Sequence, residues 1–308
     1  MPLPALLQDR LRLPVIAAPM FLASGLELVV AACRGGVVGA FPSVNVRPAE
    51  ALDNWLRVLG EALTGSDAAP WAVNLIVHRS NPRLQQDLEA CVRHRAPMVV
   101  TSVGDPAAIV TAVHSYGGIV FHDVTTLRHA RKAAAAGVDG LILVCAGAGG
   151  HGGSLNPFAF LPQVRAFWAG PLALAGAISD GRGIHAARCL GADLAYMGTR
   201  FLATQESQAA EEHKRMICAA SAADLLWTDA FTGIHGNYLR ASIQRAGLDP
   251  DALPSRDGAD LSKLGDGASK VWRDIWSAGQ GVGAIVEAPP TADLIARLRR
   301  EYHAAGGA

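Results

Sequence analysis

The chain has 308 residues, of which 50% are hydrophobic, and its formal net charge at pH 7 is zero. This length and apolar content suit one large α/β domain, because α/β barrels commonly reach this size, or two small domains. The balanced charge gives no reason to expect nucleic acid or an anionic membrane as a partner.

Two further features bear on where the protein works. Residues 1–14 contain prolines and no long apolar core, and the longest apolar region, residues 15–41, is interrupted by Pro19, by charged residues and by a Gly-Gly pair. We therefore expect neither a signal peptide nor a membrane span. The five cysteines are scattered and form no CxxC pair, which favours reduced thiols in a cytoplasmic protein over disulfides or a zinc site.

Short apolar runs alternate with helical patterns from residue 15 to about residue 200. The runs predict eight strands, at 15–19, 37–41, 71–77, 98–103, 119–121, 141–144, 172–175 and 194–197. The segments between them predict helices at 25–34, 48–63, 82–95, from Pro106 onward, at 125–136, within 158–168 and at 180–190. Gly137 and Gly191 follow two of these helices and are typical helix ends.

Eight strands with helical spacers predict an α/β fold of the (β/α)8 TIM-barrel type. An open, doubly wound sheet is the competing architecture, but no GxGxxG follows the first strand. Catalytic groups of such barrels stand at the carboxyl ends of the strands. Polar residues and glycines fill those ends here, namely Met20, Pro42-Ser43, Asn74, Ser102, His122-Asp123, His151, Gly176 and Gly198-Thr199.

The regular alternation of predicted strands and helices ends after residue 204. We expect a helical stretch at 208–223, a loop at 228–243, a segment rich in Pro, Gly and Asp at 249–267, and a last helix at 291–302. We therefore divide the chain into a barrel, residues 1–204 and 280–308, and an insert after the eighth strand. The insert, residues 205–279, is expected to act as a lid over the mouth of the barrel.

The stretch from Gly140 to Gly153 contains the strongest candidate for a catalytic residue. A short apolar run opens into a glycine-rich loop in which His151 is the only large side chain. Glycine lets the backbone approach a ligand closely, and a histidine there can move protons near neutral pH. The alternative interpretation is a glycine-rich turn with an incidental histidine.

Other candidates each have a structural alternative. Glycines after the last two strands, Gly176 and Gly198-Thr199, favour a phosphate site, because backbone N–H groups there commonly bind phosphate. Asn74 interrupts an apolar strand, and its amide forms hydrogen bonds either with the edge of a planar cofactor or with a neighbouring backbone group. The histidines His122, His78 and His235 either line a substrate entrance or have no special role. No P-loop, serine elbow or metal-ligand cluster appears, so we expect no metal.

Taken together, these stretches resemble the nitronate monooxygenase family, formerly called 2-nitropropane dioxygenases, whose members are FMN-dependent TIM barrels. The matching segments follow the family order over about nine tenths of the chain. They are Ala18-Pro19-Met20, Val73-Asn74-Leu75, Gly149-Gly150-His151-Gly152-Gly153, Leu174-Ala175-Gly176-Ala177-Ile178, Met197-Gly198-Thr199-Arg200-Phe201-Leu202 and Ala278-Gly279-Gln280.

The resemblance implies roles for these residues. His151 matches the catalytic histidine of the family. The positions expected to bind FMN are Met20, Asn74, Gly149, Gly150, Gly176, Met197, Gly198, Thr199 and Gln280. The sequence departs from the family at Val144 and Gly147, where Gln and Glu are usual, at Ala177, and at His122-Asp123. These departures cluster on the substrate side of the pocket.

Three functions follow as hypotheses. The first is oxidation of alkyl nitronates, and of neutral nitroalkanes if these are accepted, by FMN and O2 to a carbonyl compound and nitrite. The second is a flavin enoyl-thioester reductase of the same superfamily, which takes hydride from NAD(P)H. The third is a barrel that binds a phosphorylated metabolite without flavin. All three predict a small-molecule substrate, and a homodimer is compatible with each.

Overall fold

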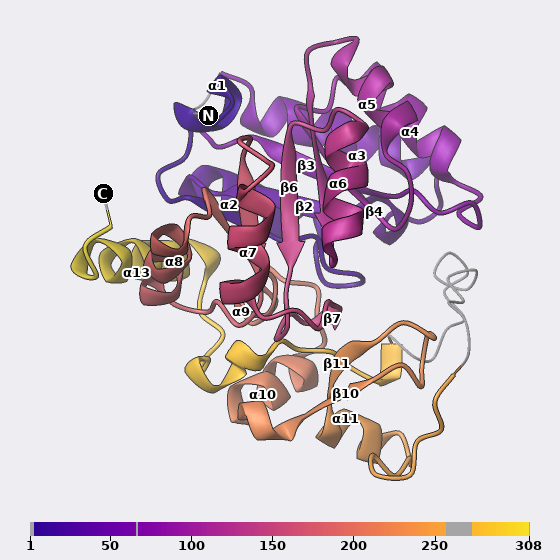
Figure 1. Ribbon diagram of the computed structural model, residues 1–308, viewed down its shortest axis with the longest axis vertical. Helices are drawn as coiled ribbons and strands as arrows, with labels where there is room; N and C mark the ends of the chain where they lie inside the picture. The colour runs from indigo at the N-terminus through magenta and orange to yellow at the C-terminus, as the bar shows by residue number, and fades with distance from the viewer. Residues whose placement is uncertain (1–2, 66, 257–272, 308) are drawn as a thin grey trace.

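A closed parallel barrel of eight strands forms the centre of the molecule (Figure 1). The computed structural model describes residues 3–65, 67–256 and 273–307. The strand order around the barrel is β1-β2-β3-β4-β5-β6-β8-β9. The strands are β1 (Val15–Ala17), β2 (Val38–Pro42), β3 (Trp71–Ile76), β4 (Met98–Ser102), β5 (Ile119–Val124), β6 (Gly140–Val144), β8 (Leu172–Ala175) and β9 (Leu194–Met197). The predicted TIM barrel is confirmed.

Helices cover the outside of this barrel. They are α2 (Leu26–Gly35), α3 (Ala51–Leu63), α4 (Leu84–Arg93), α5 (Ala107–His114), α6 (Leu127–Ala135), α7 (Pro157–Arg165), α8 (Gly181–Leu190) and the last helix, α13 (Thr291–Ala304). Helix α13 packs against both α8 and α2, so the end of the chain closes the ring. Gly191 ends α8 in the left-handed conformation, as its position in the sequence predicts.

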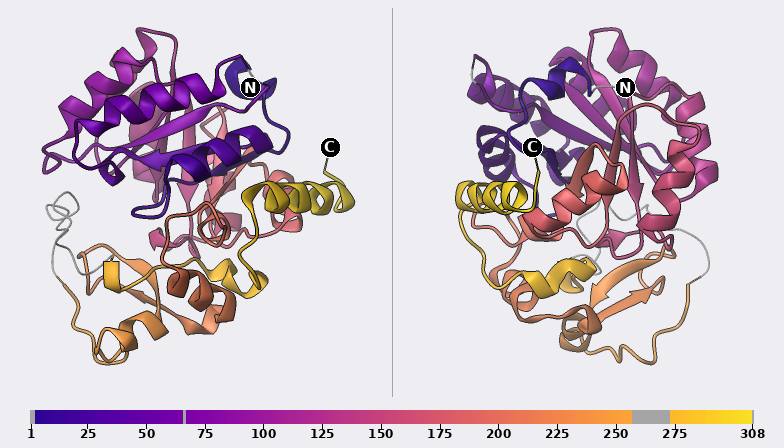
Figure 2. Two further views of the ribbon diagram at one scale, coloured as in Figure 1. Left: turned by 180° about the vertical axis from the view of Figure 1, so that it is seen from behind. Right: turned by 60° about the vertical axis from the view of Figure 1, so that its left-hand side comes forward.

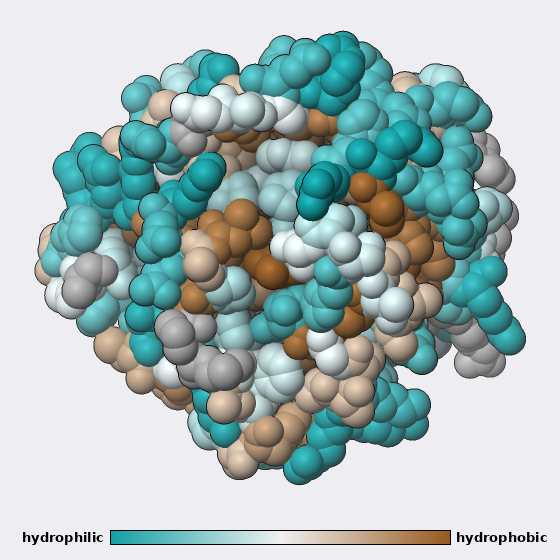
Figure 3. All heavy atoms as spheres, turned by 90° about the horizontal axis from the view of Figure 1, so that it is seen from above, coloured by the Kyte–Doolittle hydropathy of each residue, from teal (hydrophilic) through white to brown (hydrophobic). Residues whose placement is uncertain are grey.

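Short elements complete the barrel. Helix α1 (Ala5–Gln8) brings Leu7 against the interior residues at the amino end of the strands, and α9 (Thr199–Leu202) follows β9. The 3-10 turns are η1 (Ser43–Asn45), η2 (Ala222–Asp224) and η4 (Gln280–Ala284). Seen from the top of Figure 1, the molecule has a largely hydrophilic rim, and hydrophobic residues are visible in recesses nearer the middle (Figure 3).

Side chains of each strand alternate between the barrel interior and the helices. Ile142 and Val144 of β6 belong to the interior cluster, whereas Leu141 and Leu143 pack with the helices. The same alternation operates in β5, where Phe121 lies in the interior cluster and Val120 and Val124 face outward. Two apolar layers, one on each face of the sheet, therefore form the core.

The fifth strand is longer than the sequence predicts. We expected it to end at Phe121, with His122 and Asp123 just beyond, but β5 continues to Val124 and pairs with β6 through Leu143. Polar residues are uncommon in a buried strand, which is why the apolar run seemed to stop early. Because the two residues are consecutive within a strand, Asp123 faces the barrel interior and His122 faces the helices.

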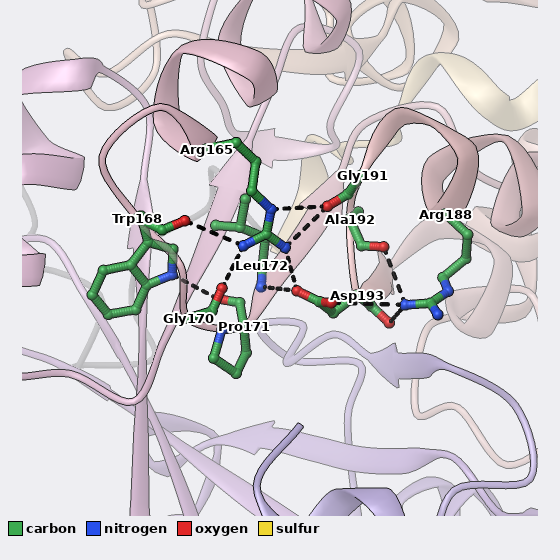
Figure 4. A network of polar contacts seen from close by, with 9 residues as sticks. All are labelled: Arg165, Trp168, Gly170, Pro171, Leu172, Arg188, Gly191, Ala192 and Asp193. Carbon is green, nitrogen blue, oxygen red and sulfur yellow. Dashed lines mark hydrogen bonds and ion pairs between the residues drawn. The ribbon is translucent and has the colours of Figure 1, made fainter. Parts of the chain in front are cut away.

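An ionic cluster ties the start of β8 to the start of β9, at the end of the barrel opposite the carboxyl ends of the strands (Figure 4). The guanidinium of Arg165 donates to the carbonyl of Gly191 and pairs with the Asp193 carboxylate. That carboxylate also accepts the Leu172 N–H at 2.8 Å. The half-buried Arg165 thus joins α7 to the α8–β9 loop and fixes the spacing of two neighbouring strands.

The insert forms a separate lobe beyond the carboxyl ends of the strands (Figures 1 and 2). It contains α10 (Glu211–Ala219), β10 (Leu225–Thr228), β11 (Gly236–Leu239) and α11 (Arg240–Arg245). The predicted helix at 208–223 is shorter than expected and is followed by η2. The predicted loop at 228–243 is wrong, because it contains β11 and the start of α11. The Pro-, Gly- and Asp-rich segment lies outside the described residues beyond residue 256.

A third strand joins the small sheet of the insert to the barrel. Strand β7 (Gly150–His151) belongs to the glycine-rich loop after β6, and it pairs antiparallel with β11. The sheet order is β10-β11-β7. None of the helices in the described part of the chain combines the length and the hydropathy that a bilayer crossing requires.

Candidate active site

A cavity of about 1320 Å³ opens at the carboxyl ends of the barrel strands. Many of the residues that the sequence singles out line this cavity, from five different strand ends and the glycine-rich loop. They are Met20, Asn74, His122, Gly149, Gly150, His151, Gly176, Gly198 and Thr199. The fold therefore brings these residues, far apart in the sequence, to one place.

His151 lies between the barrel and the insert. Its backbone pairs with Gly236 of β11, and its Nε2 lies 2.8 Å from the hydroxyl oxygen of Thr232. Burial lowers the pKa of His151 to about 4, so the imidazole is neutral at neutral pH and can accept a proton. The glycine loop alone does not hold this histidine, because the insert contributes both contacts.

The Thr232 hydroxyl favours one tautomer of His151. Its oxygen lies 3.1 Å from the carbonyl oxygen of Ile234, a group that can only accept a hydrogen bond. A hydroxyl proton directed to that carbonyl leaves the oxygen to accept from His151 Nε2–H. Nδ1 is then the nitrogen with the lone pair, and it is the atom that can take up a proton.

Close backbone contacts hold the glycine loop against the segment that follows the insert. The Gly279 N–H donates to the Thr199 hydroxyl at 2.8 Å, and the Gln280 N–H donates to the Gly147 carbonyl at 2.8 Å. A Cβ on Gly149 would lie 2.7 Å from the Gly279 nitrogen. Only glycine fits at position 149, since the two backbones touch there.

The last two barrel strands end in backbone N–H groups that lack partners. Within the described residues, no hydrogen bond is made by the backbone N–H groups of Gly176, Ala177, Gly198 and Thr199. Gly176, Gly198 and Thr199 are half-buried and Ala177 is exposed, so a ligand can reach these groups. Unpaired N–H groups at this end of a barrel commonly receive a phosphate. A Cβ on Gly198 would meet only side-chain atoms of Met20 and Ala18, none closer than 3.7 Å, so this edge of the cavity is open.

Arg200, which follows Thr199, does not take part in this site. Its side chain is 1% exposed, and Nη2 donates to the carbonyl oxygens of Ala203 and Glu287, each at 2.7 Å. Arg200 does not line the cavity, and its guanidinium forms no ion pair with the residues that the structure describes. The guanidinium instead ties α9 to the segment after η4.

Asn74 and Met20 both line the cavity. The Asn74 amide donates to the Val100 carbonyl and the Ser102 hydroxyl, both at 3.2 Å, so its amide nitrogen has a structural task. The loop carrying Met20 is shaped by Asn45, whose amide nitrogen donates to the Met20 carbonyl at 2.9 Å. The two interpretations of Asn74 are therefore compatible, because its oxygen remains available to a ligand.

Asp123 is the most unusual group in the cavity. One carboxylate oxygen, Oδ1, is buried and has no hydrogen-bond partner in the described part of the chain. Burial raises the pKa of this carboxyl to about 7. Tyr196 of β9 lines the same cavity, and burial followed by the nearby Asp123 charge raises its pKa well above the usual value. An uncompensated carboxyl in a cleft is typical of a functional site.

Asparagine at position 123 is expected to stabilise the protein at alkaline pH. The folded pKa exceeds the unfolded value of about 3.9, so stability falls as pH rises through the interval from about 4 to about 7. Above that interval Asp123→Asn removes a burial penalty of up to about 4 kcal/mol. Thermal unfolding at pH 8 and pH 4.5 tests this, with Asp9→Asn on the exposed surface as control. Equal changes in the unfolding temperature at both pH values would contradict the raised pKa of Asp123.

Four predicted residues lie outside the cavity lining. Met197 is 1% exposed and packs with the cluster around α13. Gln280 contacts the glycine loop through its backbone. His78 is bonded to Ser80 in a surface loop, and the exposed His235 stacks on Trp227 at 5.5 Å between ring centroids. The described residues contain no group of three or more His, Cys, Asp or Glu side chains that could hold a metal ion.

Sequence reasoning missed the roles of Thr232 and Tyr196. Thr232 lies 81 residues after His151, and no local pattern connects the two. Tyr196 could have been found, because it follows Leu194 by two positions in β9 and therefore faces the barrel interior. The interior position of Asp123 was obscured by the early end assigned to β5.

The chain is similar to several known proteins over most of its length. A family model described as nitronate monooxygenase matches residues 9–301. A nitronate monooxygenase of Paraburkholderia phytofirmans is 28% identical, over 94% of this chain and 92% of its own. A Mycobacterium tuberculosis enzyme named (3aS,4S,5R,7aS)-5-hydroxy-7a-methyl-1-oxo-octahydro-1H-indene-4-carboxyl-CoA dehydrogenase is 28% identical, over 75% of this chain and 64% of its own. The structure of FabK from Thermotoga maritima has a TM-score of 0.78 and 26% identity, covering 98% of this chain and 95% of FabK.

Proposed function

Because the chain belongs to the nitronate monooxygenase family, we propose that it is an FMN-dependent enzyme that oxidises alkyl nitronates with O2 to a carbonyl compound and nitrite. The observation that carries the proposal is a half-buried histidine that lines the same cavity as a set of unpaired backbone N–H groups. The same family membership argues against a barrel without flavin.

The residues present fit FMN. The unpaired N–H groups of Gly176, Ala177, Gly198 and Thr199 would hold its phosphate, and the glycine loop at Gly149 would lie against its ring. When bound, the flavin supplies the acceptor for the two electrons that leave the substrate and the route by which they reach O2. Mass analysis of the released cofactor distinguishes FMN from other flavins.

His151 would handle the proton of a neutral nitroalkane. With hydrogen on Nε2, the neutral ring would accept the α-proton at Nδ1, which leaves the substrate as its nitronate. A substrate supplied as nitronate has already lost that proton, and the histidine would then orient it. The described part of the insert, residues 205–256 and 273–279, would cover the mouth while holding His151 in place.

Thr232→Val is expected to lower kcat/KM for a neutral nitroalkane about tenfold. The substitution keeps the shape of the side chain and removes the hydroxyl oxygen that accepts from Nε2, a bond worth roughly 1–1.5 kcal/mol. Thr232→Ser retains the hydroxyl and should recover most of the rate. Turnover of the preformed nitronate is the control, because it needs no base. An equal loss with both substrates would show that Thr232 acts only on structure.

Product analysis tests the proposed reaction. The purified flavoprotein is incubated with an alkyl nitronate, and O2 uptake, nitrite and carbonyl product are measured together. The proposal predicts that nitrite and carbonyl compound form in equal amounts and that O2 is consumed. Flavin-containing protein that releases no nitrite under these conditions would contradict it.

A second candidate is oxidoreduction of an acyl thioester, including the NAD(P)H-dependent enoyl-thioester reductase reaction. The specific observation in its favour is the 28% identical M. tuberculosis enzyme, whose name places a carboxyl-CoA ester among its substrates. The cavity volume of about 1320 Å³ also exceeds the roughly 300–1000 Å³ of ordinary small-molecule sites. A flavin and a small nitronate would leave part of it unfilled.

A further inference from the structure

The ring of outer helices has a gap between α5 and α6. Around the rest of the barrel each helix packs on its neighbours, but α5 and α6 make little direct contact. The cavity extends into this gap, where Ala107 of α5 and Ala133 and Ala135 of α6 line it. Small side chains on the facing helices leave room that larger ones would fill.

Two cations on α6 line the gap. Arg128 and Lys132 are exposed, border the cavity, and make no ion pair or hydrogen bond among the residues that the structure describes. They lie one helical turn apart and flank His129, whose pKa is lowered by burial and then by these two charges. Asp105 on the opposite wall is the one acidic side chain among the described residues lining this gap, and it accepts the Ala107 N–H.

A buried histidine forms the floor of the gap. His122 is 5% exposed, and its Nδ1 lies 2.8 Å from the Thr101 hydroxyl. Since the Thr101 proton is directed to the Phe121 carbonyl at 3.2 Å, His122 donates through Nδ1 and keeps its lone pair on Nε2. Within the described residues Nε2 has no partner, although the ring lines the cavity. This acceptor faces the cavity, where a ligand could donate to it.

The gap is distinct from the site of the flavin phosphate. The unpaired N–H groups follow β8 and β9, whereas the gap lies outside β4 and β5. In the strand order β4 is directly across the barrel from β9. One bound phosphate cannot serve both regions.

We propose that the gap between α5 and α6 binds the phosphate-bearing arm of an extended substrate or cosubstrate, with Arg128 and Lys132 contacting the phosphate and His122 accepting from an N–H of the arm. An acyl thioester of coenzyme A has this chemistry, and so does NADPH. The inference rests on the second candidate function, the oxidoreduction of an acyl thioester, in which the reacting end of the ligand would reach the same cavity as His151.

Binding to the holoprotein tests the proposal without turnover. Calorimetry with coenzyme A, pantetheine, NADPH and NADH is compared for the wild type, the double variant Arg128→Gln/Lys132→Gln, and Arg131→Gln. Arg131 is a matched control, since it lies on the same helix, outside the cavity lining and over the Phe167 ring at 4.1 Å. The double variant is expected to weaken the phosphate-bearing ligand about tenfold at low salt and to reduce its salt dependence. Arg131→Gln is expected to change neither.

The ligands identify the source of the phosphate. A loss for coenzyme A with no change for pantetheine assigns the arm to a thioester. A loss for NADPH with no change for NADH assigns the contact to the 2′-phosphate of the reductant, and a loss for both dinucleotides assigns it to their shared pyrophosphate. Failure of coenzyme A, NADPH and NADH all to bind the wild type, or an equal loss in Arg131→Gln, overturns the proposal. Nitrite formation is measured separately, so failure of the nitronate reaction is distinguished from failure of this site.

Discussion

His151→Asn is expected to leave the flavin bound and to lower turnover of a neutral nitroalkane by about 10²–10⁴-fold. That range is the usual contribution of a positioned general base. Asparagine can still accept a hydrogen bond from a substrate but cannot take up a proton at neutral pH. The pKa of His151, lowered to about 4 by burial, means that the basic form is present above about pH 4 and is lost as pH falls through it.

The nitronate form of the same substrate is the control for this variant. It reaches the enzyme already deprotonated, so its turnover should fall far less than that of the neutral nitroalkane. Steady-state rates with the two forms, at a fixed flavin content, give the comparison. Unchanged turnover of the neutral nitroalkane would exclude His151 as the base, and loss of flavin would show that the variant acts through the cofactor site.

Gly149→Ala is expected to weaken FMN binding by about tenfold to a hundredfold. The added Cβ would lie 2.7 Å from the Gly279 nitrogen and 2.9 Å from the Ala278 carbonyl carbon, both backbone atoms. The glycine loop must then move away from the segment that Thr199 holds. Overpacking of this kind typically costs about 1–3 kcal/mol, which corresponds to the stated loss if the moved loop contacts the ring.

Gly65→Ala is the matched control outside the cavity lining. No atom lies within 4 Å of the Cβ position, so the substitution causes no clash, although φ of +69° costs about 1–2 kcal/mol of strain. Flavin affinity is measured by fluorescence titration and stability by thermal unfolding. Equal affinities for the two variants would contradict the position proposed for the flavin.

The barrel could be predicted because its signals are local. Each strand is a short apolar run, and each helix shows a 3.6-residue pattern or an end signal such as Gly191, so all eight strands were placed in order. The elements that were predicted wrongly depend on contacts between segments far apart in the sequence. Strand β11 contains Gly236 and Asn237, which are poor strand formers, and it exists because β10 and β7 pair with it.

Residues of the candidate site could be predicted only where a local sequence pattern distinguishes them. His151 stands out because glycines surround it. Its partner Thr232 does not, since a contact between residues 81 positions apart is visible only in the fold. The gap beside Arg128 was missed for the same reason, because unpaired cations on one helix resemble an ordinary solvated surface until the neighbouring helix is known to stand apart.

Anaerobic flavin spectroscopy tests the central claim most directly. The purified flavoprotein is mixed, without O2, with an alkyl nitronate in one sample and with NADPH in another, and the flavin absorbance is followed. The account predicts that the nitronate bleaches the flavin and that NADPH does not. Bleaching by NADPH with no response to the nitronate would contradict it and would favour the enoyl-thioester reductase.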